Sequence, residues 1–188
     1  MNSQAPVNIG TLVDINIDHY EIEIEKVKKL SNFICAQFGF RNFELSISFV
    51  DNESIRSFNL KYRNKDKPTD VLSFPQESWH EPLLVGKQEN HAPDAAAENA
   101  KNFHSTILGD LLISLDEAAE NAKRIGQTLD EELAFLIVHG ILHLLGHDHL
   151  NEKDEEIMTR EQRTLMSFLS QNSPPLWKGM VNKMVDNI

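Results

Sequence analysis

The sequence lacks the features of several protein classes. Its 188 residues include a single cysteine, Cys35, so the chain cannot form an internal disulfide. The first residues, Met1 to Pro6, have neither the basic nor the apolar segment of a secretory signal peptide. No apolar run reaches the roughly 18 residues of a membrane span, because two histidines and a glycine interrupt the longest one, at 133–145. We therefore expect a cytoplasmic protein that does not cross a membrane.

Basic residues are in the minority. Eighteen Lys and Arg against 29 Asp and Glu give a net charge of −11, which argues against nucleic-acid binding by bulk charge and leaves only a local basic patch for it. With 40% hydrophobic and 25% charged residues, the composition is that of a globular protein. At about 150 residues per domain, the length predicts one domain. We place it at residues 1–170, with a tail at 171–188 that contains Ser173-Pro174-Pro175.

Residue periodicities predict an α+β chain with a mixed α/β arrangement. Apolar and polar residues alternate at 13–17 and 43–49, as in half-buried strands, and 71–74 and 108–115 are typical of two more strands. Helices are expected at about 21–38, 51–62, from 116, at 128–145 and at 153–169, the fourth starting with a Thr128–Glu131 capping box. The stretch 76–107 has no sustained apolar period and is expected to be a mobile loop. We expect about four strands in a mixed sheet flanked by helices.

Four of the eight histidines fall within 11 residues. His139 and His143 stand four residues apart in a predicted helix, so their Cβ atoms lie about 5–6 Å apart on one face, a gap that one metal ion can bridge. Because this helix is apolar on nearly every side, we expect its imidazoles to be buried and to need partners. Gly146 can end the helix and let the chain turn back. Either His147 or His149 can then supply a third ligand, and spacing alone does not choose between them.

Three histidines with a fourth position left to water form a catalytic zinc site, whereas structural zinc sites have four protein ligands and are usually rich in cysteine. Cys35 is alone and remote, so the pattern favours a catalytic site. The metalloprotease motif H-E-x-x-H places a glutamate, the general base, directly after the first histidine. Here that position is Gly140, although Glu132 or Asp148 could substitute. Hydrolysis of a bond other than a peptide is therefore favoured.

One segment provides a local basic patch. Residues 61–67, Lys-Tyr-Arg-Asn-Lys-Asp-Lys, carry four positive charges and one negative charge. The planar donors of Arg63 suit a phosphodiester whose negative charge grows on attack. Tyr62 offers a ring face to an unpaired base. Three lysines can hold phosphates by charge: Lys61, Lys65 and Lys67. Beside a metal site, substrate binding becomes the preferred interpretation of this patch over a solvated helix end.

Three separated segments share a pattern with known proteins. The run 139–149, HGILHLLGHDH, matches H-G-x-L-H-L-x-G-H/Y-D-H at every fixed position. The segments 62–75, YRNKDKPTDVLSFP, and 108–114, LGDLLIS, precede it. Together they resemble the YbeY family, the metal-dependent endoribonucleases of bacterial ribosomal RNA maturation. The resemblance extends from the second strand to the last helix, and the loop at 76–107 is longer than in that family.

The resemblance implies a ligand set that spacing alone left open. The metal ligands would be His139, His143 and His149, holding one zinc ion (Zn2+) per chain, with His147 a neighbour of the site. The resemblance assigns RNA cleavage to Arg63. The implied fold is a mixed sheet with helices on its faces and a zincin-like metal helix beneath a cleft.

The expected function is single-strand-specific, zinc-dependent endoribonuclease activity in 16S ribosomal RNA 3′ end maturation and ribosome quality control. The implied partners are RNA, the ribosome or its proteins, and assembly GTPases. Arg63 and the ligand His143 would be catalytic, and Asp148 would either accept a proton or orient a ligand histidine. Asp70 and Asp110 would be a turn and a strand residue, or would touch the site. The alternatives are a ribosome-associated assembly factor with a mainly structural metal and a metallopeptidase-like hydrolase.

Overall fold

The computed structural model describes residues 10–87, 105–172 and 174–183. Its main sheet has four strands in the order β1-β3-β5-β4. Strands β1 (Thr11–Ile15), β3 (Phe43–Val50) and β5 (Thr106–Ser114) are parallel to one another. The edge strand β4 (Val71–Pro75) runs antiparallel to β5. The predicted fold class, a four-stranded mixed sheet flanked by helices, is confirmed.

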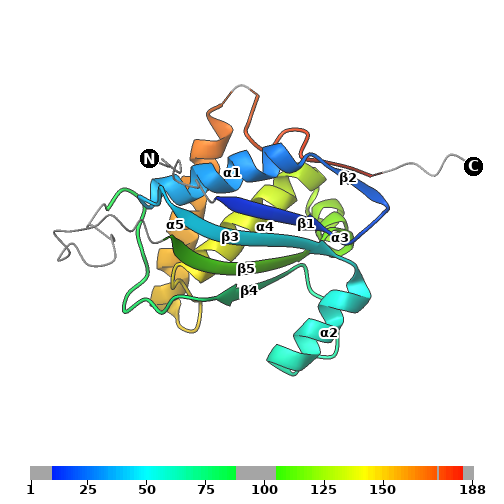
Figure 1. Ribbon diagram of the computed structural model, residues 1–188, viewed down its shortest axis with the longest axis horizontal. Helices are drawn as coiled ribbons and strands as arrows, with labels where there is room; N and C mark the ends of the chain where they lie inside the picture. The colour runs from blue at the N-terminus through cyan, green and yellow to red at the C-terminus, as the bar shows by residue number, and fades with distance from the viewer. Residues whose placement is uncertain (1–9, 88–104, 173, 184–188) are drawn as a thin grey trace, which may run out of the picture.

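Five helices lie in the part of the chain that the structure describes. They are α1 (Ile24–Gln37), α2 (Asn52–Arg63), α3 (Leu115–Ile125), α4 (Leu129–Leu144) and α5 (Glu152–Ser170). The side chain of Thr128 caps α4, and Glu131 completes the predicted capping box. None of these five helices is long and apolar enough to cross a membrane. In Figure 1, α4 and α5 lie behind the sheet, while α2 projects at the end of β3.

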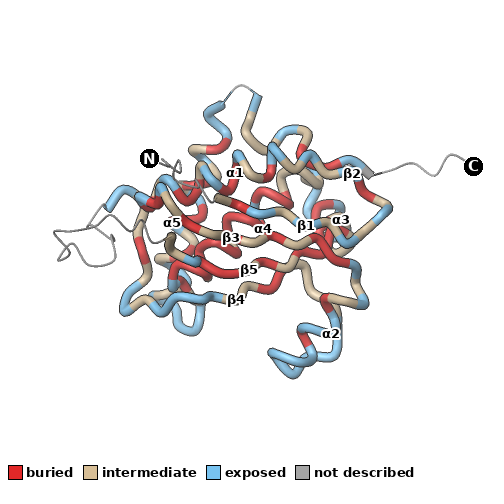
Figure 2. The backbone as a smooth tube through the Cα atoms, viewed as in Figure 1, coloured by how far each residue is buried: buried red, intermediate tan, exposed pale blue. Residues whose placement is uncertain are grey.

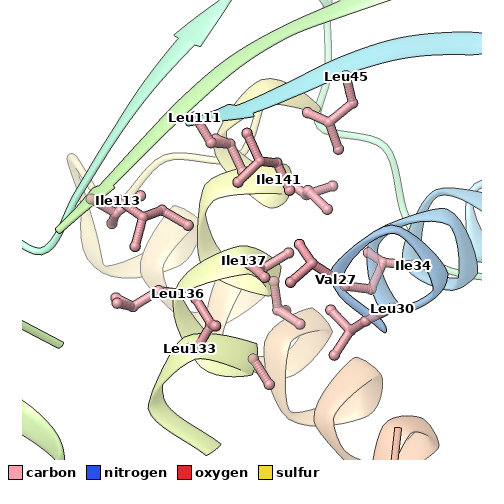
Figure 3. Close-up of a cluster of buried hydrophobic side chains, with 14 of the residues drawn as sticks. Val27, Leu30, Ile34, Leu45, Leu111, Ile113, Leu133, Leu136, Ile137 and Ile141 are labelled. Carbon is pink, nitrogen blue, oxygen red and sulfur yellow. The ribbon is translucent and has the colours of Figure 1, made fainter. Parts of the chain in front are cut away.

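One face of the sheet packs against α4 and α1. The alternation predicted at 43–49 is confirmed, because Phe43, Leu45, Ile47 and Phe49 are all buried. Figure 3 shows strand residues such as Leu111 pointing toward Ile137 and Ile141 of α4, with the apolar face of α1 beside them. Figure 2 shows the same pattern along the backbone, where the central strands and α4 are the most buried elements.

The opposite face of the sheet carries a smaller apolar cluster beneath α2. Strand residues alternate between the two faces, so Leu72 and Leu112 point away from α4. Leu72 forms a second buried cluster with Val50 and Ile55, and Leu112 and Phe74 pack against its margin. Helix α2 therefore stands on the face opposite to α4, and the edge strand β4 lies between the two helices.

A second, two-stranded sheet was missed by the sequence prediction. Strand β2 (Tyr20–Ile22) pairs antiparallel with β6 (Val181–Lys183). Because residues 20–22 form β2, α1 starts at Ile24 and not near residue 21. The first strand, β1, covers 11–15 and not 13–17. Local periodicity does not reveal such a pair, because each strand has three residues and its partner is near the other end of the sequence.

The structure describes only part of the expected loop and of the C-terminal tail. Of the loop expected at 76–107, residues 88–104 lie outside the described residues. Its expected end was wrong, because β5 already begins at Thr106 by pairing with β3. Residues 76–87 include the buried Leu83 and pack against the end of α4. Of the tail, positions 173 and 184–188 lie outside the described residues. Its described part packs on the main core through Met180 and Val181.

Candidate metal centre

Helix α4 carries two of the histidines and lies unusually close to the sheet. At Gly140, an added Cβ would lie 2.8 and 3.0 Å from the two Cδ atoms of Leu111 on β5. The helix can approach the strand this closely only because the position has no side chain. A glutamate at this position has no room, so the site has no counterpart of the metalloprotease base directly after the first histidine.

A sharp turn after α4 brings the remaining histidines back toward the helix. Gly146 has a φ of 87°, in the left-handed region that favours glycine. The segment 76–87 supports this turn through a backbone hydrogen bond from Leu83 to the carbonyl oxygen of Leu145, at 3.1 Å, and through two hydrogen bonds of side chains. The indole Nε1 of Trp79 donates to the carbonyl oxygen of Leu144 at 2.7 Å, and Nε2 of His147 donates to the carbonyl oxygen of Leu83 at 2.6 Å.

The turn brings His149, and not His147, next to the two helix histidines. One ring nitrogen from each of His139, His143 and His149 lies within 4.8 Å of the other two. The ring of His147 is only 3% exposed and is bonded to the Leu83 carbonyl, away from this group. We call His139, His143 and His149 the histidine triad.

Hydrogen bonds determine which ring nitrogens of the triad can bind a metal. Nδ1 of His143 donates to the carbonyl oxygen of His147 at 2.9 Å, and Nδ1 of His139 lies 3.2 Å from Oε1 of Gln162 on α5. Because both partners are acceptors, both Nδ1 atoms carry the proton. The two Nε2 atoms therefore carry lone pairs, and they lie 3.1 Å apart.

This arrangement fits a divalent metal ion. Burial lowers the pKa of His139, and burial together with the neighbouring His139 lowers the pKa of His143 to about 4, so both rings are neutral at pH 7. Neutral imidazoles are the form that binds metals. A tetrahedral ion with bonds of about 2.0–2.1 Å holds its nitrogen ligands about 3.3 Å apart. Both rings are half-buried, and not buried as expected, because they line a cavity.

A cavity of about 600 Å³ lies in front of the histidine triad. Arg63, at the end of α2, and Lys65, in the following turn, line it, so two members of the predicted basic patch share the cavity with the triad. Asp66, the only acidic residue of the patch, forms a 2.7 Å ion pair with Arg56, which balances its charge. The rest of the wall is formed by Thr69, Asp70, Val71, Ser73 and Asp148. We call this space the metal cavity.

The other predicted patch residues lie outside the metal cavity. Tyr62 lines a separate pocket of about 480 Å³, together with residues of β4 and β5. Lys61 is next to it, with its Nζ 4.8 Å from the centre of the Tyr62 ring. Lys67 lines neither space. The structure therefore divides the predicted patch, because consecutive residues of α2 point in different directions.

Four carboxylates were named as possible site residues, and two of them line the metal cavity. In Asp148, Oδ1 accepts a hydrogen bond from the backbone N–H of His149 at 2.7 Å, while Oδ2 has no hydrogen bond to any residue in the described ranges. Both oxygens of Asp70 accept hydrogen bonds, from the backbone of Val71 and the amide of Asn121. Glu132 and Asp110 are not in the cavity wall.

Glu132 is unsuited to replace the missing metalloprotease base. Its carboxyl group is 4% exposed and accepts a hydrogen bond from Gln127. Burial is the main cause that raises its pKa. Asp148 is therefore the better placed of the two acidic residues that the sequence offered for that role.

Gln162 is the site residue that sequence reasoning missed. Its Oε1 accepts the hydrogen bond of His139 Nδ1. Gln162 is buried, with 8% of its surface exposed. A signal was present, because Gln162 lies on the same face of α5 as Met158, Leu165 and Leu169, where Glu161 is the other buried polar residue. A buried polar side chain needs a partner, and for Gln162 the partner is a histidine of the triad.

Known proteins resemble this chain over most of its length. Residues 12–170 match the family described as Endoribonuclease YbeY. An Endoribonuclease YbeY from Sulfurihydrogenibium sp. (strain YO3AOP1) is 43% identical over 147 residues, which cover 77% of this chain and 83% of the relative. Another from Bacillus mycoides (strain KBAB4) is 38% identical over 162 residues, which cover 84% of this chain and 96% of the relative. The solution structure of TM1509 from Thermotoga maritima aligns with 87% of this chain and 95% of its own, with a TM-score of 0.48 and 19% identity. On its sequence relatives, the chain belongs to the YbeY endoribonuclease family.

Proposed function

We propose that this protein is a single-strand-specific endoribonuclease that binds one zinc ion and acts in ribosomal RNA maturation, at the 3′ end of 16S RNA, and in ribosome quality control. The observation that carries the proposal is the shared cavity of the histidine triad and Arg63. A metal site provides hydrolysis, and an arginine beside it provides recognition of phosphate. The names of the relatives support RNA as the substrate.

The histidine triad would hold the zinc ion through neutral ring nitrogens. When bound, the ion lowers the pKa of a coordinated water toward about 7 and so supplies a nucleophile at neutral pH. Gln162 and the His147 carbonyl keep the His139 and His143 rings oriented, because each accepts a hydrogen bond from an Nδ1. His147 contributes through its backbone, while its ring fixes the turn.

The remaining residues of the cavity would bind the phosphodiester and move a proton. Arg63 would contact the scissile phosphate, whose negative charge increases during attack, and Lys65 would hold a neighbouring phosphate. Oδ2 of Asp148 is the free carboxylate oxygen in the wall and would accept the proton of the attacking water. Both oxygens of Asp70 already accept hydrogen bonds, so Asp70 would position the wall.

Cleavage of a ribosomal RNA fragment with a single-stranded 3′ end tests the proposal. We expect the zinc-loaded protein to cut the unpaired segment and a chelator to stop the reaction. His143→Ala should lose zinc, measured by atomic absorption, and Arg63→Ala should keep zinc but cleave about 10²- to 10³-fold more slowly. Arg41 is exposed, and its side chain makes no hydrogen bond or ion pair in the described part of the chain, so Arg41→Ala removes the same charge and should cleave normally.

The same assay distinguishes the alternatives. A folded, zinc-loaded protein that leaves RNA intact, even with ribosomes present, would contradict the proposal and favour an assembly factor with a structural metal. Cleavage of unfolded protein but not of RNA would favour a peptidase. Equal loss in Arg63→Ala and Arg41→Ala would show that Arg63 acts only through net charge.

A further inference from the structure

A second pocket lies on the opposite side of the edge strand β4 from the metal cavity. It has a volume of about 480 Å³, within the range of about 300–1,000 Å³ for small-ligand sites. Ser73 of β4 lines both spaces, so they meet at the sheet edge. Tyr62 and Arg63 are consecutive residues at the end of α2, and each lines one of the two. A ligand that crosses β4 can therefore occupy both.

Aromatic rings form the wall of this pocket. Tyr62 is 55% exposed and Phe58 38% exposed, which is unusual for rings in a folded domain. Their rings are stacked with centres 6.1 Å apart and planes at 10°. Phe74 meets Tyr62 edge-on at 5.1 Å and 70°. These contacts hold the three rings in place, and the exposed ring of Tyr62 is of the kind on which unpaired bases stack.

A carboxylate lies beside the rings. Asp110, on β5, lines the pocket, and its side chain makes no hydrogen bond or ion pair with any residue between 10 and 87 or 105 and 183 that the structure describes. A carboxylate only accepts hydrogen bonds, and it can accept two parallel ones. Guanine presents two adjacent N–H donors, N1–H and N2–H, on one edge. Adenine, cytosine and uracil each present an acceptor next to a donor.

The charges around the pocket favour a nucleic acid over a protein partner. Nζ of Lys61 lies 4.8 Å from the centre of the Tyr62 ring, so a positive charge stands beside one of the lining rings. Arg63 and Lys65 lie in the adjoining metal cavity. One cation beside the Tyr62 ring and two in the adjoining cavity match a base attached to a phosphate chain.

We propose that the pocket of Tyr62, Phe74 and Asp110 binds a guanine base of single-stranded RNA, adjacent to the nucleotide whose phosphate lies in the metal cavity. The base stacks on Tyr62, and the Asp110 carboxylate accepts hydrogen bonds from N1–H and N2–H. The inference deepens the proposed function and rests on it for the position of the phosphate. The pocket would give the nuclease a preference for cleavage next to guanine.

Binding of short oligonucleotides tests the pocket separately from cleavage. The probes are 2′-O-methyl hexanucleotides of uridine with one guanine or one adenine, titrated onto the zinc-loaded protein by fluorescence anisotropy and recovered intact on a gel. We expect the guanine probe to bind at least fivefold more tightly. Tyr62→Ala should weaken its binding about 5- to 100-fold, and Tyr62→Phe should not. Both substitutions are at an exposed side chain, and circular dichroism verifies the fold.

Asp110→Asn tests base selection. This variant should lose the preference for guanine over adenine, because an amide offers one acceptor in place of two. Asp14→Asn is the matched control: it removes one negative charge from an exposed residue of β1 and should keep the preference. Equal affinity for both probes, or unchanged binding in Tyr62→Ala, would overturn the inference while leaving metal-dependent cleavage intact. Guanine-selective binding of the probes by a protein that does not cleave the ribosomal RNA fragment would contradict the proposed function and support the guanine site.

Discussion

At the scale of single residues, the site depends on the orientation of imidazole rings. His139 and His143 each use Nδ1 for a hydrogen bond and direct Nε2 at the same point. In the unfolded chain each ring rotates freely, so these two bonds reduce the entropy that metal binding must still remove. One of the partners is a backbone carbonyl that no substitution removes. The other is the side chain of Gln162, which can be tested.

Gln162→Leu separates metal affinity from stability. We expect about 10- to 100-fold weaker zinc binding, because His139 loses the acceptor that fixes its ring. The unfolding free energy of the metal-free protein should be unchanged or higher, because Nε2 of Gln162 is buried without a hydrogen-bond partner among the described residues and leucine removes that group. Competition with a zinc chelator and urea unfolding measure the two quantities.

Gln171→Leu serves as the control for this substitution, since Gln171 is exposed beyond the end of α5. It should change neither quantity. A Gln162→Leu protein that binds zinc as tightly as the wild type would contradict the assigned role of the hydrogen bond.

The lowered pKa values of three histidines also predict how stability depends on pH. Burial and His139 lower the pKa of His143 to about 4, and burial lowers the pKa values of His139 and His147, whereas in an unfolded chain each is about 6.5. Between these values the unfolded chain binds more protons than the folded one. The contribution of these neutral histidines to the stability of the folded protein is therefore fully present above pH 6.5 and is lost as the pH falls toward 4.

Urea unfolding of the metal-free protein at several pH values between 7.5 and 4.5 measures this effect. We expect the unfolding free energy to fall with pH, and to fall less steeply in His143→Gln, which lacks one of the groups. Parallel profiles for the two proteins would mean that His143 is not one of the groups whose titration changes the unfolding free energy.

At the scale of elements, the site depends on the distance between α4 and β5. Leu111 fills the space that a side chain at position 140 would need. In an isolated helix, alanine is more favourable than glycine by about 1 kcal/mol. At Gly140 the contact with Leu111 outweighs that preference, so we expect alanine to destabilise the protein and not to stabilise it.

Gly140→Ala should lower the unfolding free energy by about 1–3 kcal/mol, the usual cost of overpacking a core. Zinc binding should weaken as well, because α4 carries two of the ligands and must move away from the sheet. Adding Leu111→Val removes the contacting Cδ atoms and should restore part of the unfolding free energy and part of the zinc affinity. A Gly140→Ala protein more stable than the wild type would show that the sheet adapts without cost.

At the scale of the whole molecule, a segment near one end of the chain is fixed to α4 and pairs with a strand near the other end. The carboxylate of Asp130, in the first turn of α4, accepts backbone hydrogen bonds from Gly179, Met180 and Val181. These bonds hold β6 beside β2 and bury Met180. The residues 174–183 are thereby attached to the end of α4 opposite the histidine triad, so they support the fold without lining the metal cavity.

Asp130→Ala should release this segment. We expect a loss of about 1.5–3 kcal/mol in unfolding free energy, the range for hydrogen bonds to a charged group, and faster amide hydrogen exchange at 179–183. Zinc binding should be unaffected. Glu156→Ala, at an exposed position of α5, is the control and should change none of these. Unchanged exchange in Asp130→Ala would mean that packing of Met180 alone holds the segment.

Local sequence determined the elements and most of the chemistry of this protein. The two-residue alternation at 43–49 and the capping box at 128–131 act over a few residues, so they identify β3 and the start of α4 without knowledge of the fold. The i, i+4 spacing likewise placed His139 and His143 on one face. Family resemblance added His149 as the third member, and the structure brings the same three residues together.

Only the tertiary structure decided what depends on contacts between distant segments. It paired β2 with β6, placed Gln162 against His139, and placed Arg63 and Tyr62 on different sides of β4. These contacts join segments that no local period connects, and their formation depends on how the sheet and helices pack as a whole. The sequence by itself determined which groups carry out the chemistry, and packing decided which of them meet.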